Sequence, residues 1–144
     1  MRKLCLALIA CVGLITQAHA YRIGDDNGGS IGEYADRYKR VDNSGEPVEI
    51  DGICLSACTM VLGIVPRNRI CVTKRAVLGF HSATGMGANG RPGPYSYLGT
   101  QVLLDTYPYY ILQWISENRG LTPRMIYLRG PELAEMYPQC RKKT

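Results

Sequence analysis

The sequence predicts an α/β fold in which helices pack on a mainly parallel sheet and disulfides stabilise the whole. Apolar strand patterns alternate with helical patterns from residue 21 to residue 80. This alternation is typical of parallel strands joined by right-handed helical crossovers. The chain also begins with the pattern of an export leader and carries four cysteines after it. Cysteines in an exported chain favour disulfides.

Residues 1–20 have the three parts of a secretory signal peptide. Arg2 and Lys3 give a positive start, residues 4–15 are almost wholly apolar, and Ala18-His19-Ala20 has the small-x-small pattern that signal peptidase accepts. The apolar run is shorter than the roughly 20 residues that span a bilayer. We therefore expect no transmembrane segment and a periplasmic or secreted protein.

The leader has one competing interpretation. Residues 8–11, Leu-Ile-Ala-Cys, fit a lipobox. Cleavage there leaves very little apolar length, so the site after Ala20 is favoured. The expected mature chain is then one domain, residues 21–144.

The expected mature chain carries a mild positive charge. Loss of Arg2 and Lys3 leaves 15 of the 17 basic residues, against 12 acidic ones. The basic side chains are scattered apart from residues 141–143, whereas a nucleic-acid-binding protein gathers them on one face. We therefore expect no nucleic-acid partner.

Four cysteines remain after the leader, and two disulfides worth about 2–4 kcal/mol each are expected. Four cysteines allow three pairings, and the sequence does not choose among them. A zinc site is the competing interpretation. The chain has no Cys-x-x-Cys pair and one histidine after the leader, so we expect neither a metal nor another cofactor. The disulfide candidates are Cys54, Cys58, Cys71 and Cys140.

The elements before His81 alternate between strand and helix. Ser30 stands where it would cap the first helix, and Asn43-Ser44-Gly45 breaks that helix. Residues 52–56 are expected to be a tight connection. The expected strands are 21–24, 47–50, 69–73 and 76–80, and the expected helices are 30–41 and 57–65.

After His81 the character of the chain changes. Residues 84–97 are rich in Gly and Pro and predict a mobile loop. This loop is a candidate lid, a strand-like platform for substrate, or a simple flexible connection. Residues 101–118 predict a helical stretch kinked at Pro108, and residues 131–136 predict a last short helix.

Ser56 stands at a predicted strand-to-helix corner. Such a corner exposes the hydroxyl, and the free N–H groups of the following helix can stabilise an oxyanion. A serine nucleophile needs a base, and the one histidine after the leader, His81, ends the strand 76–80. Because parallel strands end at one edge of a sheet, we expect Ser56, His81 and the Gly28-Gly29 loop to share that edge.

Each of these features also has a plainer explanation. A serine at a helix start is most often an N-cap. A lone histidine after a strand is usually a structural residue, and a Gly-Gly pair usually makes a turn. The functional interpretation depends on the three features meeting at one edge.

Together these residues resemble a known family. Asn27-Gly28-Gly29, then a helix, then Gly-x-Cys-x-Ser-Ala and a histidine 25 positions after the serine resemble the Clp peptidase proteolytic subunit and, more broadly, the crotonase-like superfamily. The strands 69–72 and 77–81 resemble the pair that carries the family's histidine, and residues 127–135 resemble a later segment. Exported members with the signature Gly-x-Cys-x-Ser-Ala-Cys are more similar than the cytosolic peptidase.

The resemblance implies a site and an activity. Ser56 is the implied nucleophile and His81 the implied general base. The N–H groups of Gly29 and Ala57 are the implied oxyanion hole. The implied reaction is hydrolysis of a peptide or ester bond.

The sequence departs from the family in two places. Met125 stands where the family has the acid of its triad, and a thioether cannot stabilise an imidazolium. Asp105, Glu117 or a backbone carbonyl are the alternatives, and the spacing selects none of them. The family's earlier strands are also missing before Tyr21, so the sheet is expected to be truncated, with an exposed edge for homo-oligomer formation.

Three functional hypotheses follow. The first is an exported serine hydrolase with a Ser56–His81 dyad. The second is a catalytically inactive binding or assembly module of the same fold. The third is a plain disulfide-stabilised domain in which Ser56 only caps a helix.

Overall fold

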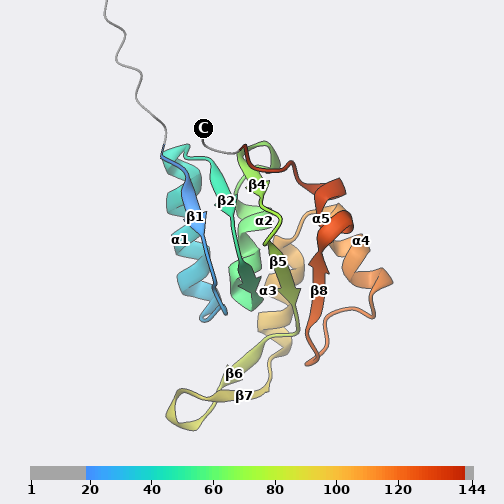
Figure 1. Cartoon of the computed structure of the whole chain (residues 1–144). Helices are drawn as coiled ribbons and strands as arrows, with labels where there is room; N and C mark the ends of the chain where they lie inside the picture. Colours follow the sequence, from blue (N-terminus) through green and yellow to red (C-terminus); the bar gives the residue numbers. More distant parts are fainter. Residues whose placement is uncertain (1–18, 142–144) are drawn as a thin grey trace, which may run out of the picture.

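The structure is a computed structural model that describes residues 19–141. Almost all of the expected leader, residues 1–18, lies outside the described residues. The α/β fold is confirmed, and in Figure 1 α1, α2 and α3 lie behind the strands while α5 lies next to β8. No helix in the described range is long and apolar enough to cross a membrane.

The elements follow one another in the order strand, helix, strand pair, helical turn and strand pair before the hairpin and the C-terminal helices. In chain order they are β1 (Tyr21–Ile23), α1 (Ile31–Ser44), β2 (Val48–Ile50), β3 (Ile53–Leu55), the 3₁₀ helix η1 (Ser56–Met60), α2 (Val61–Ile64), η2 (Arg67–Arg69), β4 (Ile70–Val72), β5 (Val77–Phe80), β6 (Thr84–Met86), η3 (Ala88–Gly90), β7 (Pro92–Tyr95), α3 (Tyr97–Thr106), α4 (Tyr109–Glu117), β8 (Ile126–Arg129) and α5 (Gly130–Met136).

The strands form two short sheets that continue into each other. One sheet has the order β1-β2-β4 and is wholly parallel. The other has the order β3-β5-β8, in which β3 and β5 are parallel and β8 is antiparallel to β5. The prediction of a mainly parallel sheet is therefore only partly correct, because the sheets are mixed and β6 and β7 form a separate antiparallel hairpin.

Residues 52–56 are not the tight connection expected from the sequence, because β3 occupies most of them. Gly52 has φ +147° and lies so close to Asp25 that a Cβ would overlap that carboxylate. The chain bends at this glycine and then continues as a second strand beside β5. A three-residue strand is too short to show an alternating pattern in the sequence.

Three other segments differ from the sequence prediction. The expected helix 57–65 is the 3₁₀ helix η1 followed by the single turn α2, and the kinked helix 101–118 is two helices that meet around Pro108. The expected mobile loop 84–97 contains the β6–β7 hairpin, which projects from the body of the domain in Figure 1. Strand β8 was not predicted.

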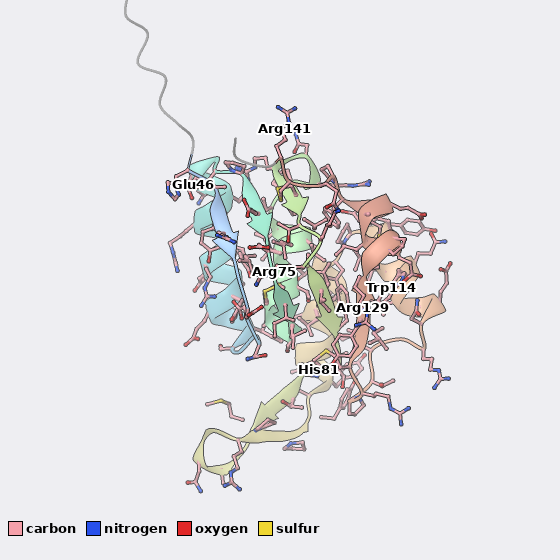
Figure 2. All side chains as sticks on the ribbon, in the orientation of Figure 1. Glu46, Arg75, His81, Trp114, Arg129 and Arg141 are labelled. Carbon is pink, nitrogen blue, oxygen red and sulfur yellow. A yellow bond between two sulfur atoms is a disulfide. The ribbon has the colours of Figure 1, made fainter. Side chains whose placement is uncertain are left out.

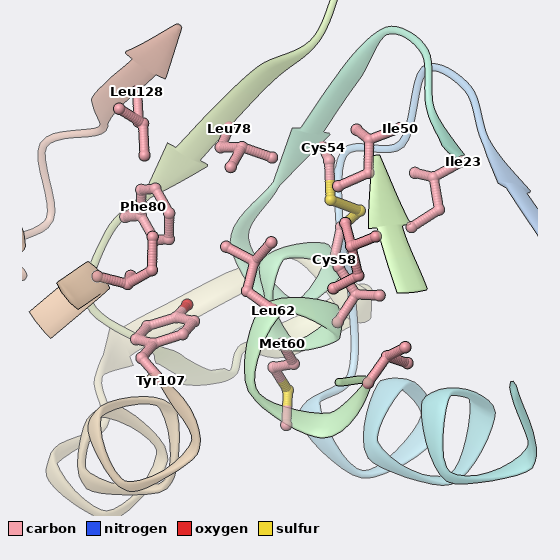
Figure 3. Close-up of a cluster of buried hydrophobic side chains, with 14 of the residues drawn as sticks. Ile23, Ile50, Cys54, Cys58, Met60, Leu62, Leu78, Phe80, Tyr107 and Leu128 are labelled. Atoms are coloured by element: carbon pink, nitrogen blue, oxygen red, sulfur yellow. A yellow bond between two sulfur atoms is a disulfide. The ribbon is translucent and has the colours of Figure 1, made fainter. Parts of the chain in front are cut away.

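The core lies between the sheets and the helices (Figure 3). One face of β1, β2 and β4 is buried toward α1, which contributes Tyr34 and Tyr38. On the other side, Phe80 from β5 packs against Tyr107 and Trp114, with ring centroids 5.4 and 5.6 Å apart. The two parts of the hydrophobic core are thus continuous, and β5 lies between them.

The structure pairs the four cysteines as Cys54–Cys58 and Cys71–Cys140. The first disulfide joins β3 to η1, on either side of Ser56. The second joins β4 to the C-terminal segment, where Val72 donates to the carbonyl of Pro138 and Cys140 donates to the carbonyl of Val72. That segment covers the outer edge of β4, while β1 forms the opposite edge of its sheet.

We predict that the two disulfides contribute unequally to stability. Their sequence separations are 4 and 69 residues, so loop-closure entropy gives about 2 kcal/mol for Cys54–Cys58 and about 4 kcal/mol for Cys71–Cys140. Urea unfolding of the Cys71→Ala/Cys140→Ala and Cys54→Ala/Cys58→Ala variants measures both. A larger loss of unfolding free energy for the short pair would contradict the prediction.

Candidate active site

Ser56 occupies a strained corner between β3 and η1. Its φ is +56°, and only Asn89 and Arg119 among the described non-glycine residues share a positive φ. A non-glycine residue in this left-handed region costs of order 1–3 kcal/mol and is often found at functional sites. The N-cap of η1 is Leu55, and the structure shows no side-chain cap there. Ser56 is therefore not the helix cap that the plainer explanation requires.

The Gly-Gly loop lies directly against this corner. Asp26 pairs with β3: it donates to the carbonyl of Ile53 at 2.8 Å and accepts from the N–H of Leu55 at 2.9 Å. Gly28, with φ +80°, then passes so close that a Cβ would overlap the carbonyl oxygen of Leu55 and lie 2.8 Å from Cβ of Ser56. Only glycine fits between the loop and the corner.

Helix α1 holds the loop in place through Asp26. One oxygen of that carboxylate accepts from the hydroxyl of Tyr34 and, at 2.8 Å, from the N–H of Gly28. The other lies 3.5 Å from Nη1 of Arg37, which stacks over the Tyr34 ring at 4.2 Å. The sequence analysis missed this role of Asp26, although an Asp two residues before a Gly is a turn signal.

Two backbone N–H groups at the corner have no acceptor within the described residues. One is the N–H of Gly29, the residue after Gly28, and the other is the N–H of Ala57 in the first turn of η1. The N–H groups of a first helical turn have no partner within the helix. A Cβ on Gly28 would lie 3.0 Å from the nitrogen of Ala57, so the loop that carries Gly29 runs past the start of η1.

His81 follows the strand that pairs with β3. Leu55 is opposite Gly79 in the parallel register, so Ser56 and His81 leave neighbouring strands at the same edge. His81 is half-buried, at the junction of the body and the hairpin in Figure 2. No hydrogen bond between Ser56 and His81 is found in the described part of the chain.

Burial sets the protonation of His81. It lowers the pKa of the imidazole below its usual value of 6.5, and a hydrogen bond with the backbone of Ser82 acts weakly in the opposite direction. The imidazole is therefore neutral at neutral pH and able to accept a proton.

The register of β5 and β8 brings Met125 towards His81. Phe80 is opposite Ile126 in the antiparallel pair of β5 and β8, so the next pair in that register is His81 and Met125. A Cβ on Gly79 would lie 2.9 Å from Sδ of Met125, which places this side chain over the strand just before the histidine. The two acids considered as alternatives, Asp105 and Glu117, are exposed, and neither hydrogen-bonds to His81 among the described residues.

The described residues contain no group of three or more His, Cys, Asp and Glu side chains that would hold a metal ion. Two neighbouring surface grooves, of about 690 and 280 Å³, share Thr73, Lys74 and Gln139. They lie along the β4–β5 bend and do not include Ser56 or His81. The candidate site itself lies at the edge of the sheet where β3 and β5 end, and both Ser56 and His81 are half-buried there.

Comparison with known proteins gives similarity in structure but not in sequence. No family model matches the sequence, and no curated protein matches it. Among solved structures, the fold is similar to that of the ClpP1 N165D mutant from Listeria monocytogenes, with 15% sequence identity and a TM-score of 0.45 over 80% of this chain and 67% of that chain. This similarity is too low to carry a function.

We predict that Gly28→Ala destabilises the protein more than Gly120→Ala. Both glycines have a similar positive φ, +80° and +71°, but nothing lies within 4 Å of a Cβ at Gly120. The left-handed backbone alone costs about 1–2 kcal/mol, and the overlap at Gly28 adds about 1–3 kcal/mol. Equal unfolding free energies for the two variants in urea would show that the Gly28 loop does not pack tightly against the corner at Ser56.

Proposed function

We propose that this protein is an exported serine hydrolase in which Ser56 is the nucleophile and His81 the general base. The observation that carries the proposal is the left-handed Ser56 at a strand-to-helix corner, packed against Gly28. A plain turn could place a glycine or asparagine there without strain. The resemblance of the Gly-Gly loop, the serine signature and the histidine to the Clp peptidase family supports the same roles.

The proposed reaction begins with proton transfer from Ser56 Oγ to the neutral imidazole of His81. The Ser56 oxygen then attacks the substrate carbonyl, and the N–H groups of Gly29 and Ala57 donate to the oxyanion. Collapse of this intermediate breaks the bond to the leaving group, which takes the proton from His81. Water then repeats the sequence on the acyl-enzyme, with His81 again as base.

The dyad must close when substrate binds, because Ser56 and His81 are not hydrogen-bonded in the substrate-free structure. Catalytic hydrogen bonds are often long before substrate binds, and they tighten to about 2.6–3.2 Å in the reacting complex. Both side chains are only half-buried, so a rotamer change needs no rearrangement of the core.

The shape of the site favours an extended peptide as substrate. In the hairpin, Ser96 donates to the carbonyl of Ala83 and Gly87 donates to the carbonyl of Arg91. Thr84 and Met86 lie between those pairs, so their backbone groups point away from β7. An extended peptide can pair with this free edge of β6, which starts three residues after His81.

One observation favours the second hypothesis, an inactive binding or assembly module. The extended register of β5 and β8 puts Met125, not a carboxylate, next to His81. Loss of the triad's acid lowers kcat by about 10⁴ in a serine protease. In such a module the open edges of β1 and β6 would bind another chain. Export itself is proposed from the leader and fits the two disulfides.

A fluorophosphonate probe tests the proposal. We expect the oxidised protein to be labelled at Ser56, and we expect the Ser56→Ala and His81→Gln variants not to be labelled. The labelling rate should rise with pH along a limb that lies below 6.5, because burial lowers the pKa of His81 and only the neutral ring accepts the proton. A folded wild-type protein that does not react would instead support the inactive module.

Probes with different groups attached to the phosphorus distinguish a peptide substrate from a simple ester substrate. A tripeptidyl phosphonate should react faster than an alkyl fluorophosphonate of equal intrinsic reactivity if β6 pairs with the substrate backbone. N-methylation of the peptide should remove this advantage. Equal rates for the two probes would argue for an ester substrate.

We predict that Met125→Asp increases the rate at which Ser56 is labelled. A carboxylate at this position lies next to His81 in the register of β5 and β8, where it would stabilise the imidazolium and raise its pKa. The gain should be roughly tenfold or more, and the pH limb should move to higher pH. The control is Met125→Asn, because asparagine has the shape of aspartate without its charge. This variant should give a much smaller increase in labelling rate.

A further inference from the structure

We propose that Thr59 and Tyr107 are positioning residues that orient the N–H of Ala57, one of the two oxyanion donors in the proposed hydrolase. The inference rests on the proposed function for its catalytic consequence. Its structural basis is a buried chain of two hydrogen bonds that ends on the carbonyl of Ser56. Neither side chain was among the candidates from sequence.

The chain runs from Tyr107 to Ser56. Thr59 Oγ1 donates to the carbonyl oxygen of Ser56 at 2.7 Å, and it lies 2.7 Å from the Tyr107 hydroxyl. A threonine hydroxyl has one proton, which is used on Ser56. The Tyr107 hydroxyl is therefore the donor to Thr59, and the direction of both bonds is determined.

Burial keeps this chain in one state. Thr59 is 0% exposed and Tyr107 is 4% exposed, so no water competes for their hydroxyls. Burial also raises the pKa of Tyr107 to about 12, and the phenol therefore stays a donor throughout the neutral range. In Figure 3 the Tyr107 ring lies between Phe80 and the η1–α2 segment.

The carbonyl of Ser56 and the N–H of Ala57 belong to one planar peptide unit. In a trans peptide these two groups point in opposite directions. A hydrogen bond that holds the carbonyl toward the core therefore directs the N–H toward the opposite side, where Gly28 passes. The same bond polarises the peptide and makes its N–H a stronger donor.

Close packing of α3 against α2 brings Tyr107 within reach. A Cβ on Gly63 would overlap the carbonyl oxygen of Thr106, so this glycine lets the end of α3 lie against α2. Tyr107 caps α3 by donating its N–H to Leu103, which anchors its backbone. The hydroxyl thus reaches η1 from an element far away in the sequence.

A plainer interpretation is that Thr59 only bonds back to its own helical turn, as threonines often do. That interpretation gives Tyr107 no role in reactivity. The two interpretations therefore differ most clearly in the effect of removing the Tyr107 hydroxyl.

The test compares Tyr107→Phe and Thr59→Val with two controls. Thr59→Ser keeps the hydroxyl, and Tyr137→Phe removes a different buried tyrosine hydroxyl, which bonds to Tyr110 at 2.8 Å. With a fluorophosphonate we expect roughly tenfold slower labelling of Ser56 in Tyr107→Phe and Thr59→Val, less than loss of a whole oxyanion donor. Probe binding before reaction should stay unchanged, and both controls should react at nearly the wild-type rate.

A second readout does not depend on catalysis. The amide proton resonance of Ala57 should move upfield in Tyr107→Phe and Thr59→Val but not in the two controls. If wild-type protein does not react with the probe, the proposed function fails, and this resonance alone decides the positioning role. Wild-type labelling with an unchanged rate and an unchanged Ala57 resonance in Tyr107→Phe would overturn the inference and leave the hydrolase standing.

Discussion

The contact of Gly28 with the backbone at Leu55 and Ser56 is the constraint on which the rest of the candidate site depends. Two backbone hydrogen bonds from Asp26 bring the loop to β3, and the absence of a side chain at Gly28 lets it pass the corner. With the loop in this place, the backbone that leads to Gly29 passes the nitrogen of Ala57 and Cβ of Ser56. A larger residue would separate the two donors.

The corner is held from both sides by different kinds of interaction. On the outer side it is steric, because the backbone of Gly28 packs directly against Leu55 and Ser56. On the inner side it is polar, through Thr59 and the Tyr107 hydroxyl. The Cys54–Cys58 disulfide closes a third connection across the corner. These restraints together account for a serine that keeps a positive φ, since such strain persists only where the surroundings impose it.

Sequence reasoning found the features that depend on residue type and spacing. The sequence predicts one sheet edge shared by Ser56, His81 and the Gly-Gly loop. The parallel pairing of β3 and β5 leaves Ser56 and His81 at the same edge of the sheet. It missed β3, because three residues are too few to show the alternating pattern of a strand. It also missed the β6–β7 hairpin, because its Gly and Pro residues are typical of a loop. It also missed Tyr107, because a contact across 48 residues leaves no local signal. The disulfide pairing depends equally on the three-dimensional fold.

The environment of His81 determines how the proposed hydrolase would work. In a complete triad the acid stabilises the imidazolium, whereas here burial destabilises it and Met125 contributes no charge. In the proposed hydrolase the base would therefore be available at neutral pH but would gain little on accepting a proton, so proton transfer from Ser56 would be the costly step. Oxyanion stabilisation would then have to supply most of the catalysis. The proposed donors, the N–H groups of Gly29 and Ala57, lie where the contact of Gly28 and the hydrogen bonds of Thr59 and Tyr107 hold the backbone.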